Sequence, residues 1–212
     1  MTAGKDWQAW HEPYADETSP LSRRLRLVQR HIASWLDDRP GEALTVVSAC
    51  AGQGHDLLGV LSIRADANRV RATLLEYDEH NVASAQAAVD DAAVRNVTVV
   101  RANAGDRAAY VGAVPADLVL MAGVFGNISE ADVHGTISAL PELCAACAIV
   151  IWTRTRRAPD LTPAVRRWLT AAGFVEQAFH APADALFSVG VHHFVGVPRP
   201  LTPRGRLFRF LA

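Results

Sequence analysis

Lysine is almost absent from this chain of 212 residues. Of the 21 basic residues, Lys5 is the only lysine and the others are arginines. The body of the chain therefore has no P-loop lysine, no Schiff-base lysine in a core and no Tyr-x-x-x-Lys pair of a short-chain dehydrogenase. The composition excludes these three kinds of chemistry.

Cysteine is scarce as well, with only Cys50, Cys144 and Cys147. This odd, low count argues against a disulfide framework and for a reducing compartment. The N-terminus carries no apolar signal core, and no apolar run approaches the roughly 20 residues that span a bilayer. We therefore expect a cytoplasmic protein with no membrane partner.

The chain also lacks an excess of charge of either sign, since its formal net charge is -1. Enzymes that act on nucleic acid need a basic surface that neutralises phosphates. We therefore expect no nucleic-acid partner. The observation against this expectation is a set of arginines that would form one patch if the fold brought them together: Arg154, Arg156, Arg157, Arg204, Arg206 and Arg209. Nothing in the sequence indicates an oligomeric state.

Apolar residues make up 50% of the chain, which is enough to form a core. Strand and helix patterns alternate along it. Strands are expected over 44–49, 72–76, 97–102, 117–123, 148–153, 174–179 and 186–197. Helices are expected from Ser19-Pro20 to Pro40, from Asp56, over 81–93, from Ser129, and from Thr162 to Gly173.

This order predicts an α/β fold with a Rossmann-like, doubly wound, mostly parallel seven-stranded sheet. The last two strands have no helix between them and should form a C-terminal antiparallel hairpin. We expect a lid segment and helical cap over residues 1–40 and one globular unit over 41–212. Residues 1–38 are the only material that we expect outside the core sheet. Ligands in such sheets bind beyond the carboxyl ends of the strands.

The loop after the first strand carries two glycines, Gly52 and Gly54. Glycine lets the backbone turn tightly and approach a ligand closely, and the N–H groups that open the next helix favour an electron-rich group. A tight turn with no ligand is the alternative, because a G-x-G segment alone is weak evidence.

The ends of the next two strands supply polar groups. Glu76, followed by Tyr77, ends the second strand, where a carboxylate suits the two hydroxyls of a ribose. Asn103, at the end of the third strand, can accept a hydrogen bond from an adenine amino group. A solvated strand end is the alternative for Glu76, and a turn signal is the alternative for Asn103 and Asp106.

The order of these segments resembles the class I S-adenosylmethionine-dependent methyltransferases over about residues 44–197. The family has an acidic residue at the position of Cys50, which is a departure here, so Asp56 or a main-chain carbonyl takes its place. The resemblance implies S-adenosyl-L-methionine as the cofactor, and it makes 41–212 the cofactor-binding domain. It implies contacts by Cys50, Ala51, Gly52, Gln53, Gly54, Asp56, Glu76, Tyr77, Asn103, Ala104, Gly123 and Val124.

The rival nucleotide is NAD. The dinucleotide fingerprint has a third small residue where this chain has Leu57. That substitution favours methyl transfer over hydride transfer.

Several absences narrow the type of methyltransferase. No Asn/Asp-Pro-Pro-aromatic segment and no Pro-Cys nucleophile follow the fourth strand, which argues against methylation of DNA bases. That strand ends in Met121, Ala122 and Gly123 with no carboxylate for Mg²⁺, so we expect no metal. Cys144 and Cys147 have C-x-x-C spacing but no partner pair, which favours structural thiols over a metal site.

The acceptor is expected to be a small molecule. The N-terminal segment contains Trp7, Trp10, His11 and Tyr14, and it is the candidate lid over the acceptor pocket. No catalytic residue is selected, although His11 and Tyr14 are candidate general bases. Candidate substrate contacts are Trp10, Phe125, Asn127 and Trp152.

For two other motifs, a structural or solvent-exposed role is favoured over a functional one. The side chains of His192 and His193 should point to opposite faces of a strand, and a structural role is favoured for both. For Arg154, Arg156 and Arg157, a solvated loop is favoured over binding of a substrate carboxylate.

Three function hypotheses remain: a small-molecule methyltransferase, an enzyme of the same fold that uses this or another nucleoside cofactor for different chemistry, and a cofactor-binding partner protein without activity.

Overall fold

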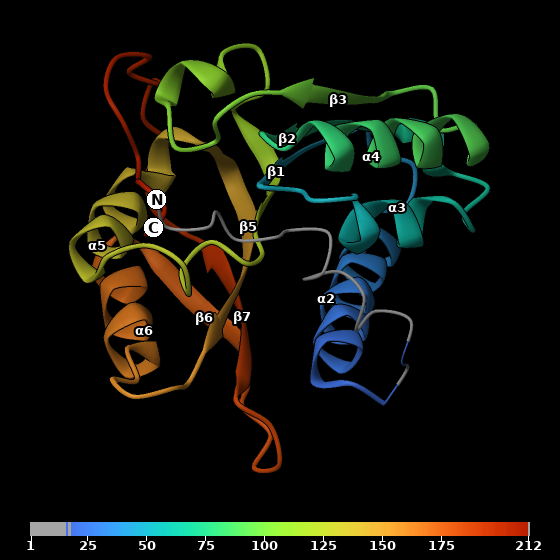
Figure 1. The fold of residues 1–212 in the computed structure, drawn as a ribbon. Helices are drawn as coiled ribbons and strands as arrows, with labels where there is room; N and C mark the ends of the chain where they lie inside the picture. The colour runs from blue at the N-terminus through green and yellow to red at the C-terminus, as the bar shows by residue number, and fades with distance from the viewer. Residues whose placement is uncertain (1–15, 17, 212) are drawn as a thin grey trace.

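A computed structural model describes residue 16 and residues 18–211, and it contains one sheet of seven strands in the order β3-β2-β1-β4-β5-β7-β6 (Figure 1). Neighbouring strands are parallel from β3 to β5, and β7 is antiparallel to both β5 and β6. The strands are β1 (Leu44–Ala49), β2 (Val70–Glu76), β3 (Val97–Arg101), β4 (Ala116–Met121), β5 (Cys144–Thr155), β6 (Phe174–His180) and β7 (Phe187–Phe194). This arrangement confirms the predicted sheet and hairpin.

Helices cover both faces of the sheet. Figure 1 shows α2, α3 and α4 on one side of it and α5 and α6 on the other. The helices are α2 (Pro20–Asp37), α3 (His55–Leu61), α4 (Glu79–Asp91), α5 (Glu130–Ala139) and α6 (Thr162–Ala171), with short 3-10 turns η2 (Ala67–Arg69), η3 (Arg107–Tyr110) and η4 (Leu140–Glu142). No helix in the described part of the chain combines the length and apolar character that crossing a membrane requires.

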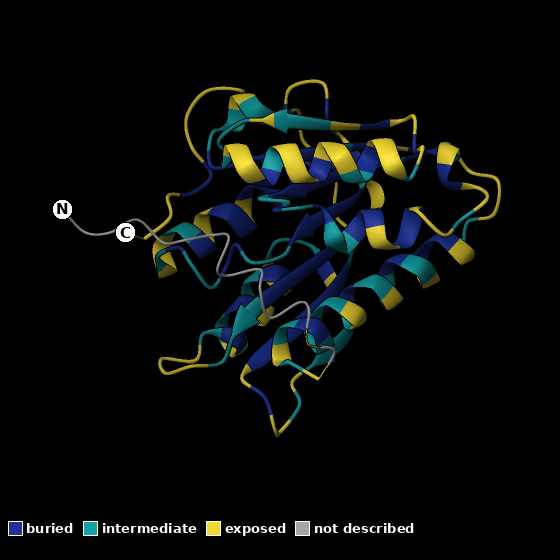
Figure 2. Cartoon of the chain, turned by 45° about the vertical axis from the view of Figure 1, so that its right-hand side comes forward, coloured by how far each residue is buried: buried dark blue, intermediate teal, exposed yellow. Residues whose placement is uncertain are grey.

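The two faces of the sheet bury separate apolar clusters. Successive residues of a strand alternate between them: Val46 packs with α2 and α3, whereas Val47 packs with α5 and α6. Figure 2 shows the buried strands between helices whose outer surfaces are exposed. Because both faces are covered, the inner strands read as continuous apolar runs rather than alternating ones.

The cap of α2 forms as predicted. Ser19 is the N-cap, its hydroxyl accepts from the Ser22 N–H at 3.1 Å, and Pro20 occupies the first turn. Val28 and Ile32 on the apolar face are fully buried. The helix therefore packs into the same apolar cluster as the sheet.

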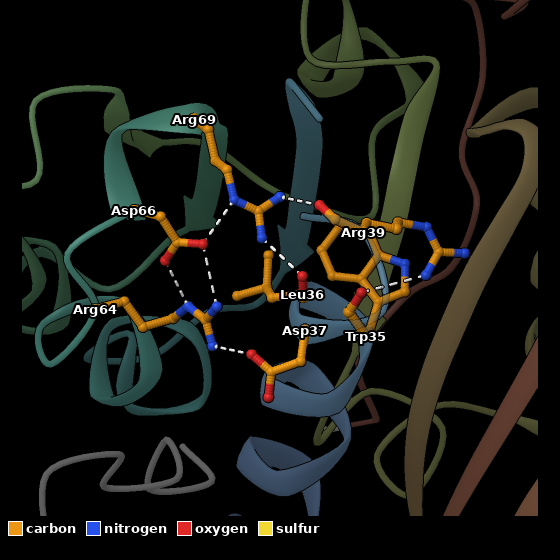
Figure 3. Close-up of polar contacts among 7 residues, drawn as sticks. All are labelled: Trp35, Leu36, Asp37, Arg39, Arg64, Asp66 and Arg69. Carbon is orange, nitrogen blue, oxygen red and sulfur yellow. Dashed lines mark hydrogen bonds and ion pairs between the residues drawn. The ribbon is translucent and has the colours of Figure 1, made fainter. Parts of the chain in front are cut away.

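A network of arginines ties the far end of α2 to the segment before β2 (Figure 3). Arg69 donates to the Leu36 carbonyl at 2.7 Å and binds Asp66 at 2.8 Å. Arg64 binds Asp66 at 2.8 Å and Asp37 at 2.7 Å. These contacts fix the direction of α2, and hence the position of its first turns beside the sheet.

One part of the architecture was not predicted. After β7 the chain does not end as a free basic tail, because residues 199–211, called here the C-terminal strap, cross the loops that follow β3 and β4. The strap forms isolated bridges from Arg206 to Asp106 and from Phe210 to Ile128. The expectation that only the N-terminal residues lie outside the core sheet is therefore wrong.

Candidate functional site

A cavity of about 670 Å³ lies at the carboxyl ends of β1, β2, β3 and β4. The strand order reverses between β1 and β4, and this is where open α/β sheets bind ligands. The walls of this first cavity come from four strand-end loops, the first turns of α2 and the C-terminal strap. Segments that are far apart in the sequence therefore meet at one place.

The loop after β1 turns sharply enough to bring its backbone to the cavity wall. Cys50 and Gly52 have positive φ angles of 54° and 56°, a left-handed conformation that disfavours side chains such as that of Cys50. The Ala51 N–H donates to the Leu75 carbonyl of β2 at 2.9 Å. Cys50, Ala51 and Gly52 consequently line the cavity.

Gly54 has a different role in the same loop. It is the left-handed N-cap of α3, with φ of 80°. A Cβ at this position would overlap the side chain of Leu58. Gly54 thus permits close packing of helix against strand.

Glu76 is the centre of the hydrogen bonding at the cavity wall. Only 8% of the residue is exposed. One carboxylate oxygen accepts from the Gly52 N–H at 2.7 Å, and the other accepts from the Tyr77 and Asp78 N–H groups, each at 2.9 Å. A carboxylate has about four acceptor positions. The three backbone donors therefore fix its orientation and leave acceptor capacity for a ligand.

Asn81, in the first turn of α4, lines the same cavity. It is 3% exposed, and its Oδ1 has no hydrogen-bond partner among the described residues. A buried acceptor without a partner is costly. The cavity therefore contains an acceptor that suits a ligand hydroxyl or amino group.

Asn103 lies in the loop after β3 and takes the role of a turn residue there. Its Oδ1 accepts from the Gly105 N–H at 2.9 Å, which stabilises the turn, and the residue also lines the cavity. The position of the next residue, Ala104, is fixed by a hydrogen bond, because the buried Tyr110 hydroxyl donates to the Ala104 carbonyl at 2.9 Å. Asp106 serves the fold, pairing with Arg206 at 3.0 Å.

Charged side chains reach the cavity from α2 and α3. Arg24 and Asp56 both line it. Burial raises the pKa of Asp56, and the nearby Arg24 partly offsets this rise. Burial also raises the pKa of the Cys50 thiol, and the Glu76 carboxylate raises it further. The Cys50 thiol is therefore neutral, and the Glu76 carboxylate lies close enough to act on it.

The C-terminal strap forms the remaining wall, with Phe208, Phe210, Arg206 and Arg209. Sequence analysis missed these residues, together with Arg24 and Asn81. The apolar pair Leu207-Phe208 within the basic tail was the available signal, and both residues are buried.

No known sequence family matches the chain, and no curated protein is detectably similar to it in sequence. Solved structures are similar in fold. An O-methyltransferase family protein from Burkholderia thailandensis aligns with a TM-score of 0.66 and 14% identity, over 89% of this chain and 59% of that one. The chain thus spans less than two thirds of that protein.

Magnesium protoporphyrin IX methyltransferase from Synechocystis PCC 6803 aligns with a TM-score of 0.66 and 15% identity, over 90% of this chain and 92% of that one. Its structures hold S-adenosylmethionine and S-adenosylhomocysteine. A precorrin-6y C5,15-methyltransferase from Geobacter metallireducens aligns with a TM-score of 0.57 and 14% identity, over 78% of this chain and 87% of that one. The chain has the fold of the class I S-adenosylmethionine-dependent methyltransferases.

Within this methyltransferase fold, most of the predicted cofactor contacts line the first cavity. They are Cys50, Ala51, Gly52, Asp56, Glu76, Tyr77, Asn103, Ala104 and Gly123. Gln53 instead contacts the His55 ring at 3.1 Å, Gly54 caps α3, and Val124 is fully buried in the core. The glycine loop is therefore brought together with Glu76 and Asn103 as predicted.

A second cavity of about 740 Å³ adjoins the first, and both are lined by Arg24 and Gly123. Its other walls come from the start of α2, the loop after β4, the end of β5 and the β6–β7 loop. Asn127 lines it, and its side chain donates to the Gly123 carbonyl at 2.6 Å. The second cavity therefore lies at the carboxyl ends of β4 and β5.

The other described candidate substrate residues are inside the core. Phe125 and Trp152 are both fully buried, with their ring centroids 6.0 Å apart, and neither lines the two cavities. The Trp152 indole N–H donates to Nδ1 of His192 at 3.2 Å. The structure thus assigns these two aromatic side chains to packing.

Two of the arginines at the end of β5 and just after it bind backbone carbonyls. Arg154 donates to the Phe125 carbonyl, and Arg156 donates to the Pro182 and Ala185 carbonyls, so neither is a freely solvated side chain. Arg154 and Arg157 line the second cavity, whereas Arg206 and Arg209 line the first.

The remaining motifs lie away from both cavities or outside the described residues. His192 is fully buried and His193 half-buried, on opposite faces of β7. Cys144 is buried and Cys147 exposed. In residues 16 and 18–211, no group of three or more His, Cys, Asp or Glu side chains is placed to hold a metal ion. The candidate residues Trp7, Trp10, His11 and Tyr14 are outside the described part of the chain.

Proposed function

We propose that the chain is an S-adenosylmethionine-dependent methyltransferase that acts on a small molecule. The first cavity holds the cofactor and the second holds the acceptor. The observation that carries this proposal is the Glu76 carboxylate, which is buried at the end of β2 and oriented by three backbone N–H groups, one of them from the glycine loop.

The polar groups of the first cavity match the parts of the cofactor. The Glu76 carboxylate suits the ribose hydroxyls, and the unpartnered Oδ1 of Asn81 accepts a further donor on the same side. The basic residue Arg24 and the acidic residue Asp56 both line this cavity, which suits the carboxylate and ammonium groups of the methionine portion. Asp56 thereby replaces the acidic residue that the family has at the position of Cys50.

The bound cofactor supplies an electrophilic methyl group on a sulfonium. The residues of the chain have to hold donor and acceptor in line and exclude water. Gly123 and Arg24 line both cavities, so they mark the passage between them. Gly123 is held there by its N–H, which donates to the Thr153 hydroxyl at 2.9 Å.

The second cavity has the size of a pocket for a small molecule. Pro20 and Leu21 line it, so the chain that precedes α2 joins it at the rim. We propose residues 1–15 as the cover of this pocket, with His11 and Tyr14 as candidate general bases. Metal-independent transfer is proposed because β4 ends at Met121 and is followed by Ala122 and Gly123, and none of the three offers a carboxylate to Mg²⁺.

One observation favours a second candidate function. Cys50 is a neutral thiol at the acidic position of the family, and a cofactor held differently there can serve other chemistry or none. Product analysis distinguishes the two, because methyl transfer converts the cofactor to S-adenosylhomocysteine and other uses do not.

The test uses the purified full chain and cofactor labelled in the methyl group. We expect label to appear in the small-molecule fraction of a cell extract, together with an equal amount of S-adenosylhomocysteine. Label in nucleic acid or protein would contradict the small-molecule acceptor. Binding of the cofactor without turnover in any fraction would favour the second candidate.

A further inference from the structure

Positive charge predominates in the walls of the second cavity. The charged residues that line it are Arg24, Arg154, Arg157 and Asp184. The Asp184 carboxylate is already paired, because its two oxygens accept from the Arg23 guanidinium at 2.8 and 3.0 Å. Arg24 also lines the first cavity, where it acts on Asp56. The charges that remain for a ligand of the second cavity are therefore those of the two arginines at the end of β5 and just after it.

The charge of Arg154 is only partly compensated within the protein. Its guanidinium donates to the Phe125 carbonyl, and its buried Nε has no hydrogen-bond partner among the described residues. Burial lowers the pKa of this guanidinium, while the carboxylates of Asp160 and Glu130 act in the opposite direction by charge alone. Neither carboxylate lines the cavity. Because arginine stays protonated in proteins, an anion in the cavity would stabilise a charge that burial disfavours.

Arg157 supplies a second guanidinium to the same cavity from its exposed side. Its backbone is held by a hydrogen bond, since the Arg157 N–H donates to the Thr155 hydroxyl at 3.3 Å. Its side chain has no hydrogen bond or ion pair with the described residues. One exposed arginine binds an anion weakly, but here it lines one cavity together with the half-buried Arg154.

The rest of the lining favours an organic anion over an inorganic ion. Apolar residues at the start of α2 and in the segment that enters β7 line the cavity, namely Pro20, Leu21, Ala185, Leu186 and Phe187. The volume of about 740 Å³ is that of a pocket for a small organic molecule. A ligand with an apolar body and one anionic group therefore matches both parts of the lining.

We propose that the methyl acceptor is a small organic anion whose carboxylate or phosphate group is bound by Arg154 and Arg157. This inference rests on the proposed function. A guanidinium matches either kind of group, because its planar fork donates two parallel hydrogen bonds to a pair of oxygens.

The bound anion anchors the acceptor and is not itself methylated. Hydrogen bonds from a guanidinium stabilise the charged form of an oxyanion and make its oxygens less basic. Another atom of the acceptor therefore forms the bond to the methyl carbon with its own lone pair, and the electron pair of the broken sulfur–carbon bond stays on the sulfur of S-adenosylhomocysteine. A proton on that atom passes to a base. The methylated product consequently keeps its negative charge.

The experiment transfers labelled methyl groups to the small-molecule fraction of a cell extract. It compares the unmodified full chain with Arg157→Gln and with the matched control Arg167→Gln, since Arg167 is an exposed arginine of α6 that lines neither cavity. Labelled products are separated on an anion-exchange resin at pH 7. Phosphatase treatment before the separation distinguishes a phosphate from a carboxylate. Calorimetry with S-adenosylhomocysteine checks that each variant keeps its cofactor site.

We expect the labelled product to bind the resin. Arg157→Gln should need about 5- to 50-fold more extract for half-maximal transfer, because acceptor binding loses a hydrogen bond to a charged group, and it should bind S-adenosylhomocysteine as the unmodified chain does. Arg167→Gln should match the unmodified chain in both measurements.

A labelled product that passes through the resin would overturn the inference and leave the proposed function standing. Half-maximal transfer by Arg157→Gln at the same amount of extract as the unmodified chain would do the same. Absence of label from the small-molecule fraction with the unmodified chain would overturn both the inference and the proposed function.

Discussion

Glu76 shows how one side chain serves the fold and the site together. Its carboxylate accepts the Gly52 N–H at 2.7 Å and thereby links the loop after β1 to the end of β2. The same group faces the first cavity. A carboxylate that is already oriented by backbone donors loses little entropy when a ligand binds.

Replacing Glu76 with Gln removes the charge of the side chain and nearly keeps its shape, so the effect of the charge can be measured. The amide cannot accept from the Gly52 N–H through its NH₂ group, and it provides no charge for the ribose hydroxyls. We expect Glu76→Gln to weaken S-adenosylhomocysteine binding by about 10- to 100-fold, the range for a hydrogen bond to a charged group. Glu79→Gln is the matched control, since Glu79 is exposed and pairs with Arg101 at 3.0 Å. Equal affinities of the two variants, measured by fluorescence titration, would contradict the role of Glu76.

Sequence patterns predicted the elements well where a local signal was decisive. Ser19 and Pro20 start α2, and Ser129 caps α5 by accepting the Asp132 N–H at 3.1 Å. The Asp132 carboxylate, however, accepts from the Arg209 N–H of the strap at 3.2 Å. A capping pattern cannot reveal such a long-range partner.

Gly105 is the residue through which the loop after β3 contacts the C-terminal strap, since its carbonyl accepts from the Leu207 N–H. An added Cβ would overlap the Phe208 carbonyl oxygen, so Gly105→Ala should push the strap off this loop. We expect this variant to bind S-adenosylhomocysteine about fivefold more weakly or worse, because one wall of the cavity is then displaced. Gly135→Ala is the control, since nothing lies within 4 Å of its Cβ position and alanine favours a helix. Calorimetry on both variants checks this, and normal binding by Gly105→Ala would show that the strap is not needed.

The β6–β7 hairpin contains a buried histidine that should make stability depend on pH. Burial lowers the pKa of His192 from 6.5 to about 4, while Glu176 raises it and Arg166 lowers it slightly. Between pH 6.5 and 4 the unfolded chain therefore takes up a proton that the folded chain does not. The free energy of unfolding should fall as the pH drops through this window, by up to about 3 kcal/mol.

His192→Asn tests this effect. Asparagine retains an acceptor for the Trp152 indole N–H but has no group that titrates. Denaturant unfolding at pH 7 and pH 4.5 should show a smaller loss of stability for the variant than for the unmodified chain. Equal losses would show that other groups cause the acid sensitivity.

At the scale of the whole molecule, two adjoining cavities share Arg24 and Gly123. The glycine loop, Glu76 and Asn103 could be predicted because each follows a strand of the parallel sheet. Arg24, Asn81 and the strap could not, since their positions depend on packing between segments distant in sequence. Alternation along β5 places Trp152 with Val150, on the face covered by α5 and α6. Because alternate residues of a strand share one face of the sheet, Trp152 packs in the core.

At the scale of the whole molecule, the arginines near the end of β5 and those of the C-terminal strap line different cavities. Arg206 and Arg209 line the first cavity, and Arg154 and Arg157 line the second. Arg23 pairs with Asp184 at 2.8 Å near the second cavity. These arginines are therefore divided between the two cavities.

Removal of residues 1–15 tests whether the first cavity holds the cofactor and the second holds the acceptor. We expect the shortened chain to bind S-adenosylhomocysteine within about threefold of the full chain, because the described walls of the first cavity remain. Methyl transfer into the small-molecule fraction should fall at least tenfold, since water enters an uncovered acceptor pocket. Retained transfer would remove the N-terminal segment from the proposal, and lost cofactor binding would give it a different role.

The most direct test of the central claim is a calorimetric titration of the full chain with S-adenosylhomocysteine, with NADH as the competing nucleotide. The account predicts saturable one-to-one binding of S-adenosylhomocysteine at micromolar concentrations and no binding of NADH. No heat at millimolar S-adenosylhomocysteine, or saturable binding of NADH in its place, would contradict it.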